Sequence, residues 1–155
     1  MTEAADRPGV IVPPPILYLG ALVAAFVLRW FWPLPFLGRQ AAVWAGIFLV
    51  LLGLVIGVWG RQTMVHAGTN VDPRRPATAI VASGPFRFSR NPLYVGLTLV
   101  YVGLITALDT AWGLLLLVPL LVVMHLGVVR REERYLEGKF GDVYRQYRAG
   151  VRRYL

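Results

Sequence analysis

A basic, turn-rich stretch between two apolar runs carries the residues best suited to chemistry. Residues 83–96 read SGPFRFSRNPLYVG, with Arg87 and Arg90 just before Asn91 and Pro92. Proline suits the first position of a helix and asparagine its N-cap, so a helix is expected to begin here. Its first turn would present N–H groups at the positive end of the helix dipole, beside the two arginines. That local field predicts a site for a carboxylate or a phosphate.

Two adjacent acids form a second group. Glu132 and Glu133 follow the last apolar run directly, and the tail after them is basic and aromatic. The tail's apolar residues recur at helical spacing, which predicts an amphipathic helix with a bend or break near Lys139. Binding to anionic lipid would explain such a tail, and positive-inside topology would explain the arginines of the first stretch. Neither explains two acids at a membrane exit, where they oppose attraction to lipid.

Membrane helices must position both groups. The chain of 155 residues is 57% hydrophobic and 15% charged, and its apolar residues come in blocks, which is typical of an integral membrane protein. Residues 1–15 are expected to be a flexible leader, and residues 16–155 a single domain. Four spans are predicted, followed by a tail at 130–155: residues 16–32, 40–60, 93–108 and 111–129.

Charge distribution predicts the orientation of these spans. The long loop at 61–92 is basic, whereas the turn at Asp109 and Thr110 has no Lys or Arg. The positive-inside rule then places the loop and both termini in the cytoplasm. The net charge of +8 follows from this topology and from attraction to anionic headgroups, so no nucleic-acid partner is expected. Because the chain has no cysteine, disulfides, zinc–thiolate sites and a cysteine nucleophile are excluded.

Residues 90–96, RNPLYVG, resemble the Arg-His/Asn-Pro-x-Tyr-x-Gly signature of the integral-membrane methyltransferases, the group around isoprenylcysteine carboxyl methyltransferase and the phospholipid N-methyltransferases. The tail from Glu132-Glu133 to Arg152-Arg153 resembles the carboxyl-terminal motif of the same family, and GTNVDP at 68–73 is similar to many bacterial members. The resemblance implies an all-α bundle of about four transmembrane helices. An amphipathic C-terminal helix would cap its cytosolic pocket, with S-adenosylmethionine as the methyl donor. The short chain resembles a minimal bacterial member, expected in the inner membrane.

The resemblance also implies roles for single residues. Seven positions match the two donor-binding motifs: Arg90, Asn91, Pro92, Tyr94, Gly96, Glu132 and Glu133. Asn91 stands where many relatives have histidine. Tyr144 is a further candidate for the aromatic wall that adenine or a sulfonium would contact. On the acceptor side the resemblance implies an arginine near the carboxyl terminus, and Arg148, Arg152 and Arg153 all remain candidates.

The acceptor is expected to be a lipid or a lipophilic small molecule that carries a carboxylate, an amine or a thiol. A carboxylate or thiolate needs no base, but an arginine would orient it. An amine needs a group to take its proton, and His125 or one of the glutamates is the candidate. No metal site is expected.

Two alternatives come from other classes of protein. Membrane sterol reductases have a similar Arg-x-Pro-x-Tyr region and a tyrosine-bearing tail, and the basic loop would suit the phosphates of NADPH, but their chains are much longer. A small four-span transporter or scaffold is the other alternative. None of the predicted spans contains Asp or Glu, which counts against transport of a cation.

Overall fold

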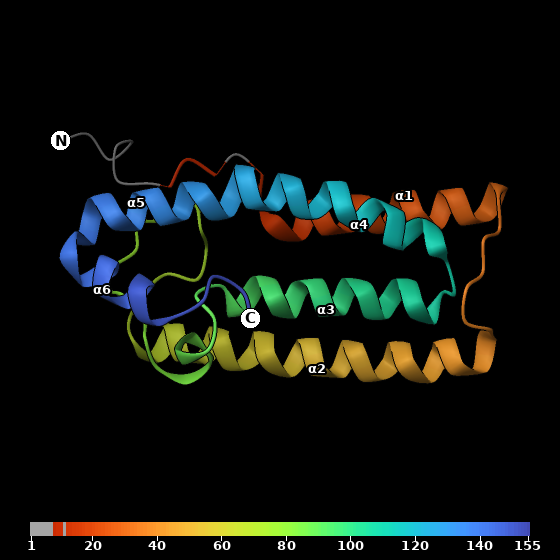
Figure 1. Ribbon diagram of the computed structural model, residues 1–155, viewed down its shortest axis with the longest axis horizontal. Coiled ribbons are helices and arrows are strands. Elements are labelled where there is room, and N and C mark those ends of the chain that lie inside the picture. The colour runs from red at the N-terminus through yellow and green to blue at the C-terminus, as the bar shows by residue number, and fades with distance from the viewer. Residues whose placement is uncertain (1–7, 11) are drawn as a thin grey trace.

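The described part of the chain has four helices of 14 or more residues, and they lie side by side along the molecule (Figure 1). The computed structural model describes residues 8–10 and 12–155, and that part of the chain contains helices and no strand, as predicted. The elements are α1 (Pro14–Phe31), α2 (Arg39–His66), the 3-10 turn η2 (Gly84–Arg87), α3 (Pro92–Ala107), α4 (Ala111–Met124), the π-helix η3 (His125–Val129), α5 (Arg130–Phe140) and α6 (Asp142–Gly150). Because successive long helices alternate in direction, the start of α3 and the end of α4 meet at one end of the bundle (Figure 1).

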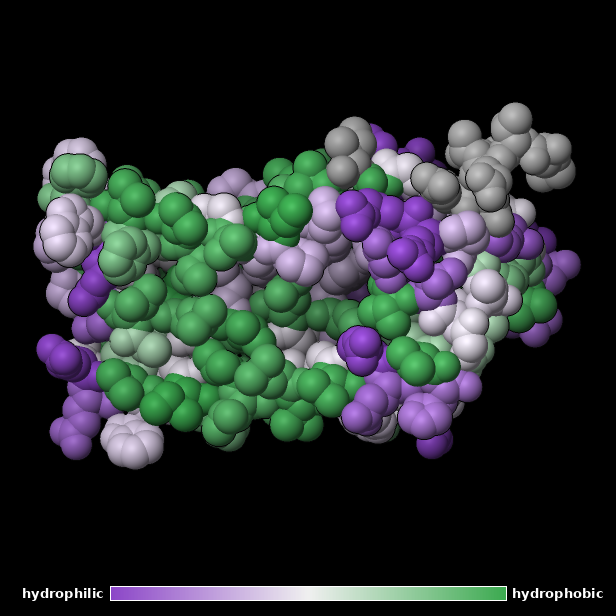
Figure 2. All heavy atoms as spheres, turned by 180° about the vertical axis from the view of Figure 1, so that it is seen from behind, coloured by the Kyte–Doolittle hydropathy of each residue, from purple (hydrophilic) through white to green (hydrophobic). Residues whose placement is uncertain are grey.

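The surface of the bundle is that of a membrane protein. Three described helices are long and apolar enough to cross a bilayer, namely Pro14–Phe31, Arg39–His66 and Ala111–Phe140, and α3 is a shorter apolar helix. Trp44 and Phe48 on the outer face of α2 are 68% and 65% exposed. Figure 2 shows an apolar belt along the helices, with hydrophilic residues gathered towards the ends. The last apolar stretch ends at Val129, so the charged helix α5 lies beyond the membrane-spanning part.

Part of the segment predicted to be a flexible leader is packed against the bundle. Residues 1–7 and 11 lie outside the described part, but Val10 is only 7% exposed and joins a core cluster with Tyr18 and Tyr101. The Arg131 guanidinium donates to the Gly9 carbonyl over 2.9 Å. The segment is held because an apolar side chain and a backbone acceptor both find partners on the bundle.

Glycines let α2 and α3 approach closely. A Cβ on Gly53 would lie 2.6 Å from the Gly96 carbonyl oxygen, and one on Gly46 would lie 2.6 Å from the Gly103 carbonyl oxygen. Such contacts exclude any side chain, as expected where small residues drive helix packing in membranes. Sequence spacing also pairs Gly57 with Gly53, but a Cβ on Gly57 would have nothing within 4 Å.

Gly53→Ala should therefore lower stability, while Gly57→Ala should not. The added methyl group at Gly53 meets backbone rather than a mobile side chain, so the two helices must separate, at a cost of about 1–3 kcal/mol. At Gly57 alanine has room and a better helix propensity than glycine. Thermal unfolding of both variants in the same detergent measures the difference, and equal losses would contradict this account of the α2–α3 contact.

The tail folds as two short helices. Gly141 adopts φ 55° and ψ −123°, a left-handed φ that favours glycine, and it separates α5 from α6. The break lies close to the point expected near Lys139. Because α5 continues the line of α4 and α6 turns back, α6 packs against the end of the bundle where α3 begins (Figure 1).

Candidate functional site

A cavity of about 530 Å³ lies where α1, α3, α5, α6 and the loop after α2 meet. Most of its walls are apolar and come from Pro13 to Pro15, from the loop around Val71 and Ile80, and from Leu97. A polar side is formed by six of the residues singled out from sequence: Arg90, Asn91, Tyr94, Glu132, Glu133 and Tyr144. The structure thus brings together side chains from both motifs, although they are about 40 residues apart in sequence.

The start of α3 is tied to the C-terminal segment. The helix begins at Pro92 with Asn91 as its N-cap residue, as predicted, but the Asn91 side chain forms no capping hydrogen bond. Its amide Nδ2 instead donates to the Arg153 carbonyl over 2.9 Å. The Arg90 backbone N–H donates to the Arg152 carbonyl, also over 2.9 Å. The tail therefore occupies the position beside the helix start where the sequence predicted an external anion.

Glu133 lies between two arginines. The Arg153 guanidinium donates to it through Nε and Nη2, with distances of 3.0 Å from Nε to Oε1 and 2.8 Å from Nη2 to Oε2. The Arg90 Nη2 atom lies 3.2 Å from Oε1. Glu133 is only 7% exposed, so its charge is compensated within the protein rather than by water. These contacts join the residues just before α3 to α5 and to the C-terminal segment.

The Arg90 guanidinium has N–H donors without hydrogen-bond partners. Its side chain is 9% exposed, and its Nε and Nη1 atoms are buried without a hydrogen-bond partner in the described part of the chain. Buried groups of this kind are rarely left unpaired, because each costs the free energy of its lost hydration. Since Arg90 also lines the cavity, these donors fit an acceptor group bound there.

Glu132 lies in a different environment from its neighbour. The Tyr94 hydroxyl donates to its Oε1 over 2.7 Å, and no basic side chain in the described part of the chain pairs with it. Burial raises the pKa of the Glu132 carboxyl to about 7, and the charge of Glu133 adds to this, whereas the bond from Tyr94 acts in the opposite direction. The cavity therefore holds a carboxyl group that has no cation of its own.

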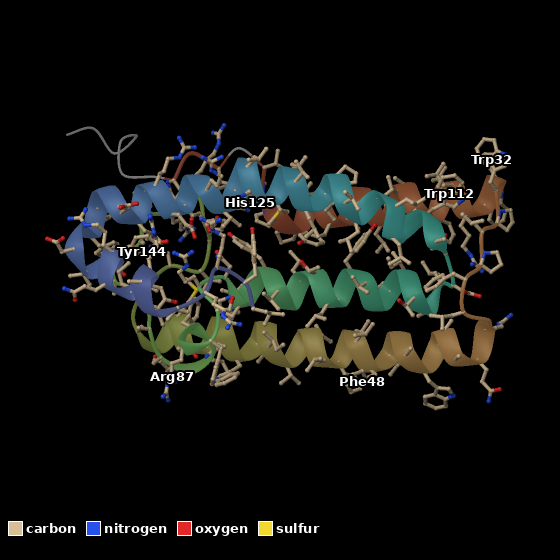
Figure 3. All side chains as sticks on the ribbon, viewed as in Figure 1. Trp32, Phe48, Arg87, Trp112, His125 and Tyr144 are labelled. Carbon is tan, nitrogen blue, oxygen red and sulfur yellow. The ribbon has the colours of Figure 1, made fainter. Side chains whose placement is uncertain are left out.

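Aromatic residues of α6 complete the cavity. Tyr144 is 2% exposed, and burial raises the pKa of its hydroxyl to about 12, so this side chain is neutral. The Tyr147 hydroxyl donates to the Phe86 carbonyl over 2.8 Å, which holds α6 against η2. Figure 3 shows Tyr144 within this end of the molecule, whereas Arg87 points away from the bundle.

A family model for phospholipid methyltransferase matches residues 41–143, which is more than half of the chain. The chain belongs to the phospholipid methyltransferase family. The match spans residues 90–96 together with Glu132 and Glu133, and it confirms the family resemblance found from sequence. An uncharacterized protein of Haemophilus influenzae is 36% identical over 63 residues, which cover 41% of this chain and all of that protein. No solved structure matches the chain.

Other residues predicted for the site of this phospholipid methyltransferase family member lie elsewhere. Pro92 is buried at the start of α3 outside the cavity lining, and Gly96 serves the contact with α2. Arg148 pairs with Glu137 over 2.7 Å. The Arg152 side chain is exposed. These positions support the helices and the tail rather than lining the cavity.

His125 lies outside the cavity lining, at the first residue of the π-helix. Its Nδ1 atom lies 2.8 Å from the Tyr154 hydroxyl, so the tail reaches η3 as well as the residues just before α3. Figure 3 shows His125 on the helix line that leads into α5. A π-turn often marks a functional position, and here it coincides with the histidine considered as a base.

Sequence reasoning missed the N-terminal wall of the site. Pro8 and Pro13 to Pro15 line the cavity, yet no pattern in a proline-rich leader indicates this. The loop from Thr69 to Arg75 also lines it, and there the family-like GTNVDP string was a signal. Within this loop Asp72 accepts hydrogen bonds from Arg74, which lower the pKa of the Asp72 carboxyl. In this member of the phospholipid methyltransferase family, the N-terminal prolines and the loop from Thr69 to Arg75 are therefore both part of the cavity wall.

Proposed function

We propose that this chain transfers the methyl group of S-adenosylmethionine to a lipophilic or membrane-embedded acceptor at the cytosolic surface of the membrane. The observation that carries the proposal is the pairing, in one cavity, of a buried arginine with unused donors and a buried carboxyl without a cation. Arg90 and Glu132 are complementary to the two charged ends of an amino acid. The donor contains such an amino-acid moiety, and NADPH does not.

The residues present fit the donor. Its carboxylate would take hydrogen bonds from Arg90, and its ammonium would pair with Glu132, since charge-assisted hydrogen bonds are the stronger kind. Tyr144 would offer an aromatic wall and Asn91 would border the same side. A cavity of about 530 Å³ is in the usual size range for a small-molecule site. When bound, the donor supplies an already activated methyl group on its sulfonium.

For the acceptor we propose a lipid or lipophilic molecule with a carboxylate, amine or thiol. Methyl transfer would then depend mainly on holding the nucleophile in line and excluding water, tasks that suit an apolar cavity. Among the three candidate arginines, Arg148 pairs with Glu137 and Arg153 with Glu133, whereas Arg152 has no ion pair in the described part of the chain. Arg152 is therefore the candidate for orienting an anionic acceptor. For an amine, His125 or Glu132 would take the proton.

We further propose that both termini and the cavity face the cytoplasm of a bacterial cell. The arginine-rich helices α5 and α6 and the loop after α2 gather at the end of the bundle where the described chain begins and ends (Figure 1). Basic residues concentrate on the cytoplasmic side of membrane proteins. The opposite end contains the short connections from α1 to α2 and from α3 to α4.

Calorimetric titration of the detergent-purified protein tests the donor. We expect saturable binding of S-adenosylmethionine and S-adenosylhomocysteine, and none of NADPH. Binding of NADPH alone would contradict the proposal and favour a reductase, and binding of none of the three would favour a transporter or scaffold. Once the donor binds, transfer of its labelled methyl group to a bacterial lipid extract would show which class of acceptor is used.

A further inference from the structure

The C-terminal segment binds three residues that line the polar side of the cavity, Arg90, Asn91 and Glu133, although its own residues lie behind that lining. Its main chain accepts hydrogen bonds from the Arg90 backbone and the Asn91 side chain, both at 2.9 Å. Its Arg153 side chain then reaches back to Glu133 on α5. The segment therefore has two independent attachments, one through its backbone and one through the Arg153 guanidinium.

The two arginines bind Glu133 differently. Arg153 approaches side-on with Nε and Nη2 and reaches both carboxylate oxygens, at 3.0 and 2.8 Å. Arg90 makes one longer contact, from Nη2 to Oε1 at 3.2 Å, and keeps Nε and Nη1 unpaired. The side-on pair is the stronger and more directional arrangement, so Arg153 determines how the Glu133 carboxylate is oriented.

This arrangement has a consequence for Arg90. A carboxylate freed from Arg153 would have both oxygens available, and Arg90 could then take the side-on position with its own Nε and Nη2. A buried guanidinium gains from such a pair, because it satisfies a donor that is otherwise unpaired. Arg90 would then have fewer donors to offer to a ligand in the cavity.

We infer that Arg153 is a positioning residue for the donor side of the site: by occupying Glu133, it keeps the Arg90 donors free for the ligand's carboxylate. The inference rests on the proposed function, since it assumes that Arg90 binds that carboxylate. It differs from the acceptor-side role that the family resemblance implies for a C-terminal arginine. An acceptor-side arginine would leave donor affinity unchanged when replaced, whereas a positioning residue would not.

The test compares two ligands that differ only in the carboxylate, S-adenosylmethionine and decarboxylated S-adenosylmethionine. Arg153→Gln should weaken calorimetric binding of the first about tenfold, the loss of roughly one charged hydrogen bond, and change binding of the second less than twofold. Arg153→Lys should behave like Arg153→Gln, because lysine keeps the charge but lacks the planar fork. Arg145→Gln is the matched control: this exposed tail arginine pairs with Asp142 and lies outside the cavity lining, so both affinities should stay at the wild-type value.

Several outcomes would overturn the inference. If Arg153→Gln weakened the binding of both ligands equally, the cause would be a general loss of structure. If it changed the affinity for neither ligand, Arg153 would have the acceptor-side role that the family resemblance implies. Full rescue by Arg153→Lys would show that charge alone matters. If Arg153→Gln does not fold, as judged by thermal unfolding in detergent, the same comparison of the two ligands is made with Arg153→Lys. Failure of the wild-type protein to bind either ligand would instead overturn the proposed function, and this inference with it.

Discussion

Arg90→Gln is expected to weaken S-adenosylmethionine binding by about a hundredfold. Each hydrogen bond to a charged group contributes about 1.5–3 kcal/mol, and glutamine cannot replace the two free guanidinium donors or the positive charge. The neighbouring Glu133 keeps its side-on partner Arg153, so the carboxylate is not left alone in a buried position. Calorimetric titration at constant pH and salt gives the change in dissociation constant.

Arg87→Gln is the matched control for this variant. Arg87 lies three residues upstream on the same basic stretch, but its side chain is exposed and points away from the bundle (Figure 3). Donor affinity should therefore stay within about twofold of wild type, as is usual for a surface substitution. Equal losses at the two positions would indicate a general effect of positive charge, and would contradict a specific contact from Arg90.

The meeting of the two motifs could be predicted from the sequence. Pro92 indicates where α3 begins, and Glu132 follows the end of the last apolar run, so antiparallel helices put both at one membrane surface. The structure brings Arg90 and Glu133 into contact, consistent with that topology. What made this part predictable is that span ends and helix starts depend on local sequence.

The partners of individual side chains could not be predicted in the same way. Asn91 has the ideal residue type for an N-cap, yet its side chain binds the Arg153 carbonyl. Glu133 and Arg153 pair across the break at Gly141, and helical periodicity says nothing about contacts beyond such a break. Both outcomes depend on where the C-terminal segment returns in three dimensions.

Two further differences show how packing decides the role of a residue. Gly96 belongs to the donor motif by resemblance, but the structure uses its missing side chain to admit α2, as the 2.8 Å distance from a built Cβ to the Gly53 carbonyl shows. Val10 belongs to a proline-rich leader, yet it is buried in the core cluster. A motif or a composition indicates which residues matter, whereas the contacts indicate what they do.

Affinity for S-adenosylhomocysteine should rise roughly tenfold between pH 6 and pH 7.5, because Glu132 ionises over this range. Burial is the main cause that raises the pKa of its carboxyl to about 7. Below that pH the group is mostly neutral and attracts an ammonium weakly, and above it the carboxylate carries its charge. Calorimetry in buffers of equal ionic strength measures the profile.

Glu132→Gln should flatten this profile and weaken binding at pH 7.5. Glutamine keeps the shape of the side chain and can still accept the hydrogen bond from Tyr94, but it cannot ionise. If the affinity of Glu132→Gln still rose with pH as in the wild-type protein, a group other than Glu132 would be responsible for the pH dependence. The next variant would then be His125→Asn, because His125 is held to the tail by Tyr154 at the same end of the bundle. A flat profile in the wild-type protein would mean that the ammonium of the ligand does not depend on Glu132, and the charge complementarity proposed for the cavity would then rest on Arg90 alone.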